Sequence, residues 1–220
     1  MIIVNFKCYE ESTGANAVKL ALICEKVSKE MNVPILVAVQ PADIYRVSKE
    51  VTIDVYGQHA DAVHYGAFTG HVIVECLKEN GAVGLLLNHS EKRMLIDEIE
   101  YVLHQARNNL FGVVICVSDS EIGEALSDLL PDSIAIEPPA LIGGDVSVSV
   151  AKPSIISEAY DRIVKKNKVN LLVGAGIKTK DDVQRALDLG ATGILVSSGV
   201  VLSKNPEKVL REFCEAFSKF

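Results

Sequence analysis

The chain has 220 residues, of which 49% are hydrophobic and 23% charged, as in an ordinary soluble globular protein. It carries 22 Lys and Arg against 29 Asp and Glu, a net charge of −7, and no long basic block. This balance argues against nucleic acid and against an anionic membrane surface as partners. No apolar run reaches the roughly 18 residues that a membrane-spanning helix needs.

The cysteines favour a reducing compartment. There are five of them, an odd number scattered along the chain, and no two form a CxxC pair. No signal-peptide pattern opens the sequence. We therefore expect a cytoplasmic protein without a disulfide framework.

Short runs rich in Val, Ile and Leu recur along the chain. Their near-continuous apolarity over four or five residues predicts parallel strands buried on both faces. The predicted strands are Ile2–Phe6, Ile35–Val39, Ile53–Tyr56, Val83–Leu87, Val113–Val117, Ser133–Ile136, Leu171–Val173 and Gly193–Val196.

Amphipathic stretches at helical spacing follow these strands. The predicted helices are Ala17–Met31, Pro41–Ser48, Val72–Asn80, Leu95–Ala106, Glu121–Leu130, Ile155–Val164, Asp181–Leu189 and Pro206–Phe217, the second and third showing the pattern least clearly. Thr179 and Asp182 have the spacing of a capping box, and Asn205-Pro206 places a cap before a first-turn proline.

No linker or composition shift divides these strand-then-helix units. We therefore predict one compact α/β domain over residues 1–220, a closed (β/α)₈ barrel, with an open doubly wound sheet as the alternative. The active site of such a barrel forms where its strands end. The polar and glycine residues at these ends are Asn5, Lys7, His89, Glu91, Glu137, Gly174, Gly176, Ser198 and Gly199.

Each of these residues alone has a plain structural explanation. A lysine at a strand end is usually solvated, a histidine before a helix usually packs or caps, and glycines often serve only a tight turn. Their gathering at one end of one predicted barrel is what indicates a site.

The motifs at these strand ends resemble the triosephosphate isomerase family, and with it the TIM barrel. They are NFK at 5–7, NHSEKR at 88–93, IEPPALIGG at 136–144, VGAGI at 173–177 and SSG at 197–199, with YGAFTGH at 65–71 similar to the family's third loop. The match keeps the family's order over nearly the whole chain. The short length is similar to that of the archaeal branch.

The resemblance implies an aldose–ketose isomerase, an intramolecular oxidoreductase of glycolysis and gluconeogenesis. It would interconvert dihydroxyacetone phosphate and D-glyceraldehyde 3-phosphate by proton transfer through an enediolate. It implies no cofactor and no metal.

Glu137 is then the expected base. Pro138 disfavours the α region for the residue before it, and so holds Glu137 extended at the strand end. A carboxylate with a free pKa near 4.3 is a poor base for a carbon acid unless it is desolvated. Closure of the apolar tip at 140–142 would supply that desolvation.

The resemblance gives the other polar residues their roles. His89 would donate to the substrate oxygens. It is expected to begin a helix, whose positive end would keep the imidazole neutral. Lys7 would supply a fixed positive charge with Asn5 beside it, and Glu91 would position Lys7.

Backbone N–H groups are expected to bind the phosphate, because glycines allow close approach and helix N-termini favour anions. The candidates are Ile142, Gly143, Gly174, Gly176, Ser198 and Gly199.

The lid segment departs from the common family pattern. Ala140 stands where many members have tryptophan, Gly144-Asp145 replaces Thr-Gly, and Gly176 replaces a serine that often latches the closed lid. A second glycine predicts a looser hinge, and Asp145 adds negative charge near an anionic substrate.

The resemblance also implies a homotetramer or a homodimer, with the helix-four and helix-five surfaces as the extra contact. The third loop would pack against a neighbouring subunit, which puts His59, His64 and His71 near an interface. A metal site at these histidines is a weaker hypothesis, because their spacing is irregular and no cysteine joins them.

Two other functions stay open at this stage. One is another sugar-phosphate barrel, an epimerase or a Schiff-base aldolase, for which Lys7 is the strand-end lysine available. The other is a phosphate-binding scaffold that has lost turnover.

Overall fold

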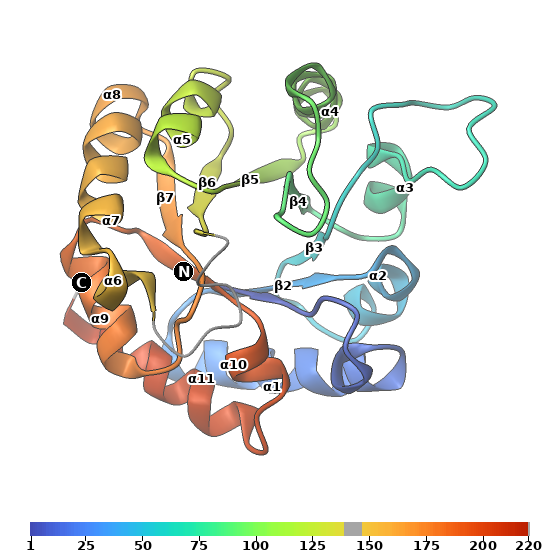
Figure 1. The fold of residues 1–220 in the computed structure, drawn as a ribbon. Coiled ribbons are helices and arrows are strands. Elements are labelled where there is room, and N and C mark those ends of the chain that lie inside the picture. The colour runs from blue at the N-terminus through green and yellow to red at the C-terminus, as the bar shows by residue number, and fades with distance from the viewer. Residues whose placement is uncertain (139–146, 220) are drawn as a thin grey trace.

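A computed structural model describes residues 1–138 and 147–219, and within them eight parallel strands close into a barrel in chain order (Figure 1). β1 pairs with β2 on one side and with β8 on the other, which completes the circle. The strands are β1 Ile2–Asn5, β2 Ile35–Val39, β3 Val55–Gly57, β4 Gly84–Leu87, β5 Gly112–Val117, β6 Ser133–Ile136, β7 Asn170–Val173 and β8 Gly193–Val196. The predicted closed barrel is confirmed, and the open sheet is wrong.

The strand predictions agree with the structure to within two residues. β2, β6 and β8 keep their predicted bounds. β3 begins two residues later than predicted, since Val37 pairs with Val55 and donates to the carbonyl of Asp54.

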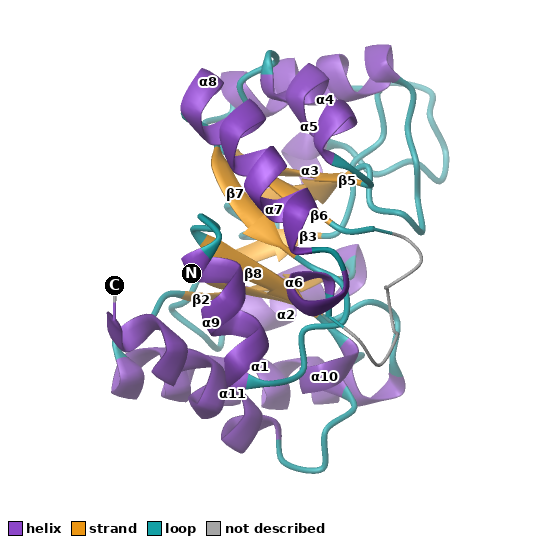
Figure 2. Cartoon of the chain, turned by 60° about the vertical axis from the view of Figure 1, so that its left-hand side comes forward, coloured by secondary structure: helices purple, strands orange, loops and turns teal. Residues whose placement is uncertain are grey.

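Helices surround the barrel and cover the strands on the outside (Figures 1 and 2). They are α1 Ala15–Met31, α2 Pro41–Ser48, α3 Val74–Glu79, α4 Ile96–Asn108, α5 Ser120–Ser127, α6 Val148–Ala151, α7 Pro153–Ala159, α8 Lys165–Asn167, α9 Lys180–Asp188, α10 Ser198–Val201 and α11 Pro206–Glu215. A π turn at Tyr160–Val164 joins α7 to α8, and 3₁₀ turns lie at Glu10–Ser12 and Ala216–Lys219.

The eight predicted helices are present with adjusted bounds, α2 as predicted and α3 shorter. The predicted helix Ile155–Val164 is part of a longer helical stretch that runs through the π turn. α6, α8 and α10 were not predicted, because helices of three or four residues leave no periodic pattern.

Successive strand residues face opposite sides of the barrel wall. In β1, Ile3 packs in the barrel interior, whereas Ile2 and Val4 pack with residues of the helices outside. The interior cluster is Ile3, Leu36, Ala38, Leu86, Val114, Cys116, Ala135, Leu172 and Leu195. The barrel is therefore a filled core, and ligands are restricted to its mouth.

Both predicted helix starts are confirmed. The Thr179 side chain accepts from the Asp182 amide at 3.2 Å, and the Asp182 carboxylate accepts from the Thr179 amide at 2.9 Å. The Asn205 side chain accepts from the Lys208 amide at 3.0 Å, with Pro206 in the first turn. Such caps satisfy N–H groups that a helix leaves open at its start.

The segment between β3 and α3 projects from the body of the barrel (Figure 1). Asp61 closes its base, since its amide donates to the Val72 carbonyl and its carboxylate accepts from the Val72 amide, both at 2.7 Å. Among the described residues, no helix combines the length and apolarity needed to cross a bilayer.

Candidate active site

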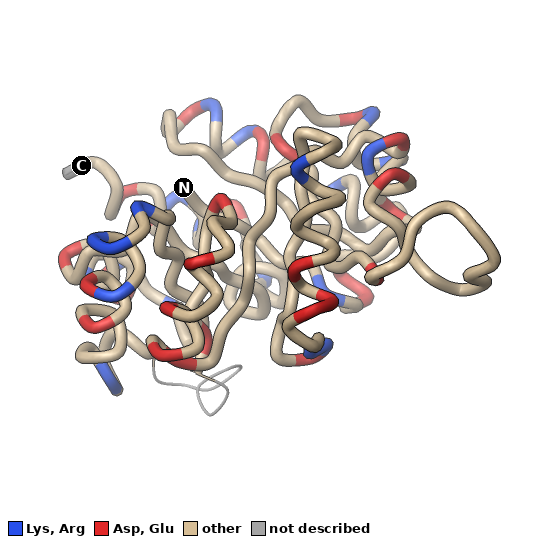
Figure 3. The backbone as a smooth tube through the Cα atoms, turned by 90° about the horizontal axis from the view of Figure 1, so that it is seen from above, with Lys and Arg blue, Asp and Glu red and all other residues tan. Residues whose placement is uncertain are grey.

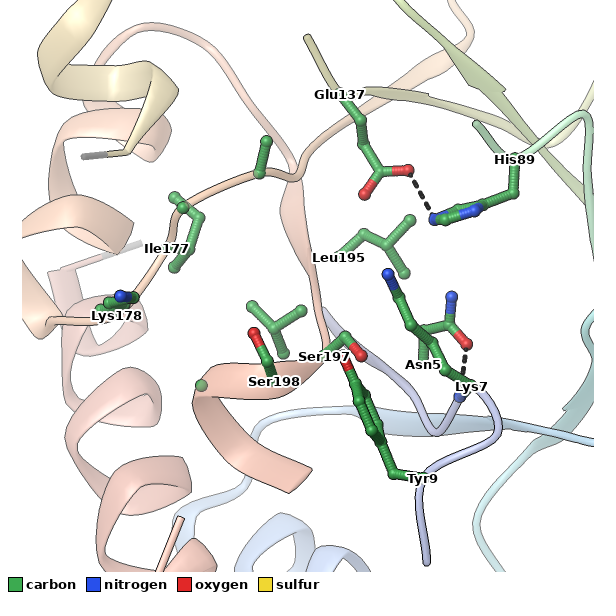
Figure 4. A pocket seen from close by; sticks show the side chains of 14 residues that line it. Asn5, Lys7, Tyr9, His89, Glu137, Ile177, Lys178, Leu195, Ser197 and Ser198 are labelled. Atoms are coloured by element: carbon green, nitrogen blue, oxygen red, sulfur yellow. Dashed lines mark hydrogen bonds and ion pairs between the residues drawn. The ribbon is translucent and has the colours of Figure 1, made fainter. Parts of the chain in front are cut away.

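A pocket lies at the carboxyl ends of the strands (Figure 4). It is lined by Asn5, Lys7, Tyr9, His89, Glu137, Ala175, Gly176, Ile177, Lys178, Leu195, Val196, Ser197, Ser198 and Gly199. Its walls come from both ends of the chain and from the middle, because the barrel brings β1, β4, β6, β7 and β8 to one rim.

Glu137 is a buried carboxylate at the rim, with 6% of its surface exposed. Its amide donates to the Val117 carbonyl at 2.8 Å and so continues the ladder between β5 and β6 by one residue. Burial raises the pKa of Glu137 to about 7, while Lys7 and a hydrogen bond from the Cys116 thiol act in the opposite direction. A carboxylate with this pKa can act both as a base and, once protonated, as an acid near neutral pH.

Gly174 makes room for this carboxylate. A Cβ atom at Gly174 would lie 2.6 Å from both Cγ and Oε1 of Glu137, which is too close for any side chain. Its N–H donates to the Ile136 carbonyl at 3.0 Å and so continues the ladder between β6 and β7. The prediction that Gly174 binds phosphate through its amide is therefore wrong, since that amide is already used.

His89 lies opposite Glu137, 7% exposed (Figure 4). Its Nδ1 accepts from the Glu91 amide at 3.2 Å, which assigns the ring proton to Nε2. Nε2 lies 3.4 Å from Glu137 Oε2, longer than a normal hydrogen bond. That oxygen is buried and has no hydrogen-bond partner within the described ranges, so it is open to a substrate.

The helix that was expected to keep His89 neutral is not there. α4 begins at Ile96, seven residues later, and a turn from His89 to Lys92 follows the strand instead. Burial, followed by the charge of Lys7, lowers the pKa of His89. The neutral state of His89 stays a prediction, and what favours it is desolvation together with the amide that occupies Nδ1, not a helix N-terminus.

The segment that carries His89 is held by two side chains that the sequence analysis missed. Asn88, at a φ of 58°, donates to the Cys116 carbonyl at 3.0 Å and accepts from the Met94 amide at 3.0 Å. Arg93 donates to the Asn88 carbonyl at 2.9 Å. These bonds fix the end of β4 to the end of β5, where the Cys116 thiol contacts Glu137.

Lys7 points into the pocket (Figure 4). It pairs with Glu91, with Nζ 2.7 Å from Oε1. Its backbone has a φ of 49°, which non-glycine residues adopt at a cost. Two side chains hold it there: Asn5 Oδ1 accepts from the Lys7 amide at 3.0 Å, and Gln58 donates to the Lys7 carbonyl at 3.0 Å. Gln58 was missed by the sequence analysis, although it directly follows β3.

The opposite side of the pocket consists largely of main chain. Ala175 and Gly176 both have positive φ, 69° and 73°. Gly199 lies so close to the preceding loop that a Cβ there would come within 3.2 Å of the Ile177 carbonyl. Ser198 and Gly199 form the first turn of α10, where backbone N–H groups have no partner inside the helix. This side can bind an anion.

A model described as triosephosphate isomerase matches residues 1–216 of this chain. The chain belongs to the triosephosphate isomerase family. It is 47% identical over 213 residues to the triosephosphate isomerase of Saccharolobus solfataricus, covering 97% of this chain and 94% of that protein. It is 45% identical to that of Methanothermus fervidus over 213 residues, covering 96% of each.

The solved triosephosphate isomerase of Bartonella henselae shows the same fold, with a TM-score of 0.74 over 98% of both chains at 19% sequence identity. The family interconverts dihydroxyacetone phosphate and glyceraldehyde 3-phosphate in glycolysis, so the chain is an aldose–ketose isomerase. The predicted family and reaction are confirmed, and the epimerase and aldolase alternatives are not supported.

Two further residues of the isomerase pocket were missed. Tyr9 lines it beside Lys7. Ser197 precedes α10 but makes no side-chain cap, and its hydroxyl is buried without a partner in the described chain. Its place in the SSG motif was a signal, but which of the two serines turns its hydroxyl inward depends on the backbone at the end of β8.

Two groups of predicted residues remain. Ile142 and Gly143, with the lid departures at Ala140 and Gly144-Asp145, fall outside the described residues. Of the three histidines, His59 contacts Asp61 at 3.0 Å and His71 packs edge-on against Phe68.

Proposed function

We propose that Glu137, His89, Lys7 and Asn5 perform the isomerisation at this pocket. Glu137 removes a proton from the carbon beside the substrate carbonyl, which leaves an enediolate. The same carboxyl group then returns a proton to the neighbouring carbon. The observation that carries this proposal is the buried Glu137 Oε2, which has no hydrogen-bond partner in the described chain and lies 3.4 Å from the neutral His89 Nε2.

His89 acts on the substrate oxygens. Because Nδ1 accepts from the Glu91 amide, Nε2 is the nitrogen that donates. As negative charge moves onto the carbonyl oxygen, this N–H strengthens its bond to it. A neutral imidazole suits the step. The acidity of its N–H lies closer to the acidity of the enediol than the acidity of an imidazolium does.

Lys7 and Asn5 stabilise the same charge. The Lys7 ammonium, 13% exposed at its side chain, is held by Glu91 at 2.7 Å and works in a partly desolvated site. Asn5 uses its carbonyl oxygen for the Lys7 amide, which leaves its NH₂ group for the substrate. Glu91 is 59% exposed and positions the lysine without contacting the reacting atoms.

The phosphate binds on the main-chain side, at the amides of Gly176, Ser198 and Gly199. These residues line the pocket opposite Glu137 and His89. Ile142 and Gly143 complete the grip by resemblance to the family. The substrate thus lies with its reacting carbons under the side chains of one half and its phosphate on the other half.

The experiment is turnover of glyceraldehyde 3-phosphate in a coupled assay, beside Glu137→Gln. We expect a loss of at least about a thousandfold in kcat, with binding of the inhibitor 2-phosphoglycolate retained. Glu207→Gln, a surface change of the same kind on α11, is the matched control and should keep full activity. Wild-type turnover that survives in Glu137→Gln would exclude this base, and a wild type that binds but does not turn over would revive the scaffold hypothesis.

The chain is proposed to assemble as a homotetramer, or else as a homodimer, first through the projecting segment. Residues 62–74 contain no Asp, Glu, Lys or Arg, and the projection carries no charge in Figure 3. Tyr65 and Phe68 are 68% and 42% exposed on it. Exposed aromatic residues without charge are typical of the centre of a protein interface.

A cavity of about 560 Å³ beside the catalytic residues is the proposed seat for the partner's projection. It is lined by Asn5, Lys7, Cys8, Tyr9, Gln40, Pro41, Gln58, His59, Val72, His89, Glu91 and Lys92. Since Lys7 and His89 face this cavity too, a partner seated there would shield them from water.

The second contact of a tetramer would use α4 and α5. Exposed apolar side chains gather at their ends: Leu95, Ile96, Leu110, Ile122 and Leu130. Light scattering of wild type, Phe68→Asp and Leu110→Lys separates the two contacts. Phe68→Asp should give smaller, weakly active species, and Leu110→Lys an active dimer. A monomeric, fully active wild type would contradict both.

The cytoplasm is the proposed location, and residues 1–220 the proposed single domain. All five cysteines are free, and Cys24, Cys116 and Cys214 are buried. Free cysteines are usual in a reducing compartment, whereas an oxidising one favours disulfides. Cell fractionation and a single cooperative unfolding transition are the respective tests.

A further inference from the structure

A buried cluster of two serines and an aspartate lies behind the phosphate side of the pocket. Ser147, Ser149 and Asp182 are 2%, 3% and 9% exposed. Ser147 Oγ donates to Asp182 Oδ1 at 2.6 Å, and Ser149 Oγ donates to the Asp182 carbonyl at 3.1 Å. The two hydroxyl oxygens lie 3.0 Å apart. The cluster joins the residues before and in α6 to the first turn of α9.

Helix capping does not account for the bonds to the two serines. The second carboxylate oxygen, Asp182 Oδ2, accepts from the amides of Lys178 and Thr179 and from the Thr179 hydroxyl, at 3.1, 2.9 and 2.8 Å. That is the capping box of α9. The bonds to Ser147 and Ser149 use Oδ1 and the main-chain carbonyl, which a cap does not need.

The two serines hold Val148, the residue between them. The Val148 amide donates to the Ala175 carbonyl at 3.3 Å. Ala175 has a φ of 69°, which costs an ordinary residue stability unless its surroundings enforce it. The bond from Val148 ties this turn to α6.

The direction of that carbonyl sets the direction of the next amide. In a trans peptide the C=O of one residue and the N–H of the following residue point to opposite sides of the bond. With the Ala175 carbonyl turned back toward Val148, the Gly176 N–H is turned away from α6. Gly176 and Ala175 both line the pocket, so an amide turned away from α6 is available to a phosphate bound there.

We infer that Asp182, with Ser147 and Ser149, is a positioning cluster that aims the Gly176 amide at the substrate phosphate. This inference rests on the proposed phosphate grip. It places a specificity element of the site in side chains that touch neither the substrate nor the reacting atoms.

The test compares the double variant Ser147→Ala/Ser149→Ala with Thr179→Ala. The first removes the bonds to Oδ1 and to the Asp182 carbonyl and leaves the capping box intact. The second weakens the cap and leaves the serine bonds intact. A purely structural role predicts that both variants only melt earlier.

The positioning role predicts a split between phosphorylated and unphosphorylated substrates. In the double variant, KM for glyceraldehyde 3-phosphate and the inhibition constant of 2-phosphoglycolate should rise about tenfold. The slow isomerisation of glyceraldehyde, which has no phosphate, should change by less than about twofold. Thr179→Ala should lower Tm yet keep both constants near the wild-type values.

Equal losses on glyceraldehyde and on its phosphate would overturn the inference, as would an unchanged inhibition constant in the double variant. If the double variant fails to fold, Ser149→Ala alone should raise the inhibition constant about threefold, and no rise there contradicts the inference equally. Failure of the wild type to bind 2-phosphoglycolate would overturn the proposed grip itself, whereas normal wild-type binding with an unresponsive double variant overturns this inference alone.

Discussion

The two halves of the pocket are built differently. On one side, the ends of β1, β4 and β6 present the side chains of Lys7, His89 and Glu137. On the other, the ends of β7 and β8 present main chain at Gly176 and at the start of α10. The function of the first half depends on the chemistry of its side chains. The function of the second half depends on the conformation of its backbone. Substitutions in the two halves should therefore differ in whether they change kcat or KM.

After Glu137→Gln, the largest effect is expected from Lys7→Met, which keeps a long side chain and removes the charge. Loss of a fixed cation near the oxyanion should lower kcat/KM about 10²–10³-fold. Steady-state kinetics measures this, with Lys208→Met on the exposed face of α11 as a control for net charge. A loss of less than about fivefold would remove Lys7 from the chemistry.

Paired glycine substitutions sharpen the comparison between the halves. Gly174→Ala drives a methyl group into Glu137, so kcat should fall roughly 10–100-fold with little change in KM. Gly176→Ala, at a φ of 73°, strains the phosphate side and should mainly raise KM. The same kinetic pattern from both would mean that the two halves are not separable.

Much of this division could be predicted from the sequence, and the reason is physical. Lys7, His89 and Glu137 follow apolar runs that can only be buried strands, and parallel strands bring their carboxyl ends together. The order of strands and the chemistry of these side chains follow from that. Asn88 and Gln58 do not, because their partners, the carbonyls of Cys116 and Lys7, lie 28 and 51 residues away.

The wrong and missed predictions concern features that the local sequence does not reveal. The local motif at Gly174 resembles a phosphate-binding glycine, but it does not reveal that Glu137, at the end of the adjacent strand β6, fills the space beside it. The cause assigned to the neutral His89 failed because NHSEKR turns before α4 begins. Ser147 and Ser149 carry no signal until the fold places them against Asp182.

Stability should depend on pH through Glu137. Its pKa is about 7 in the folded chain and 4.5 as an unperturbed group, so the folded state binds a proton that the unfolded state releases between these values. The associated stability is fully present below pH 4.5 and is lost as pH rises through 7. Across that range the loss is about 3 kcal/mol at 1.36 kcal/mol per pH unit.

Glu137→Gln removes that ionisation, so it should unfold with a higher free energy than wild type at pH 8 and match it more closely at pH 4.5. Urea unfolding at the two pH values measures the difference. A variant that is equally destabilised at both would show that Glu137 is not held in a desolvating site.

The smallest effect is expected from Glu91→Gln. The amide can still accept from Lys7, and the pair is partly exposed, so the lost charge should matter little. We expect a few-fold fall in kcat/KM that shrinks as salt is added. A loss as large as that of Lys7→Met would mean that Glu91 takes part directly in the reaction.

Isomerisation in D₂O tests the central claim most directly. Glu137 as the base takes up a substrate proton that can exchange with solvent before it is returned, so part of the product should carry one deuterium on the carbon that receives the proton. Mass spectrometry or NMR of the product reads this out. Rapid turnover by the wild type with no deuterium in the product would instead indicate direct hydrogen transfer between the two carbons, and would contradict a carboxylate base at Glu137.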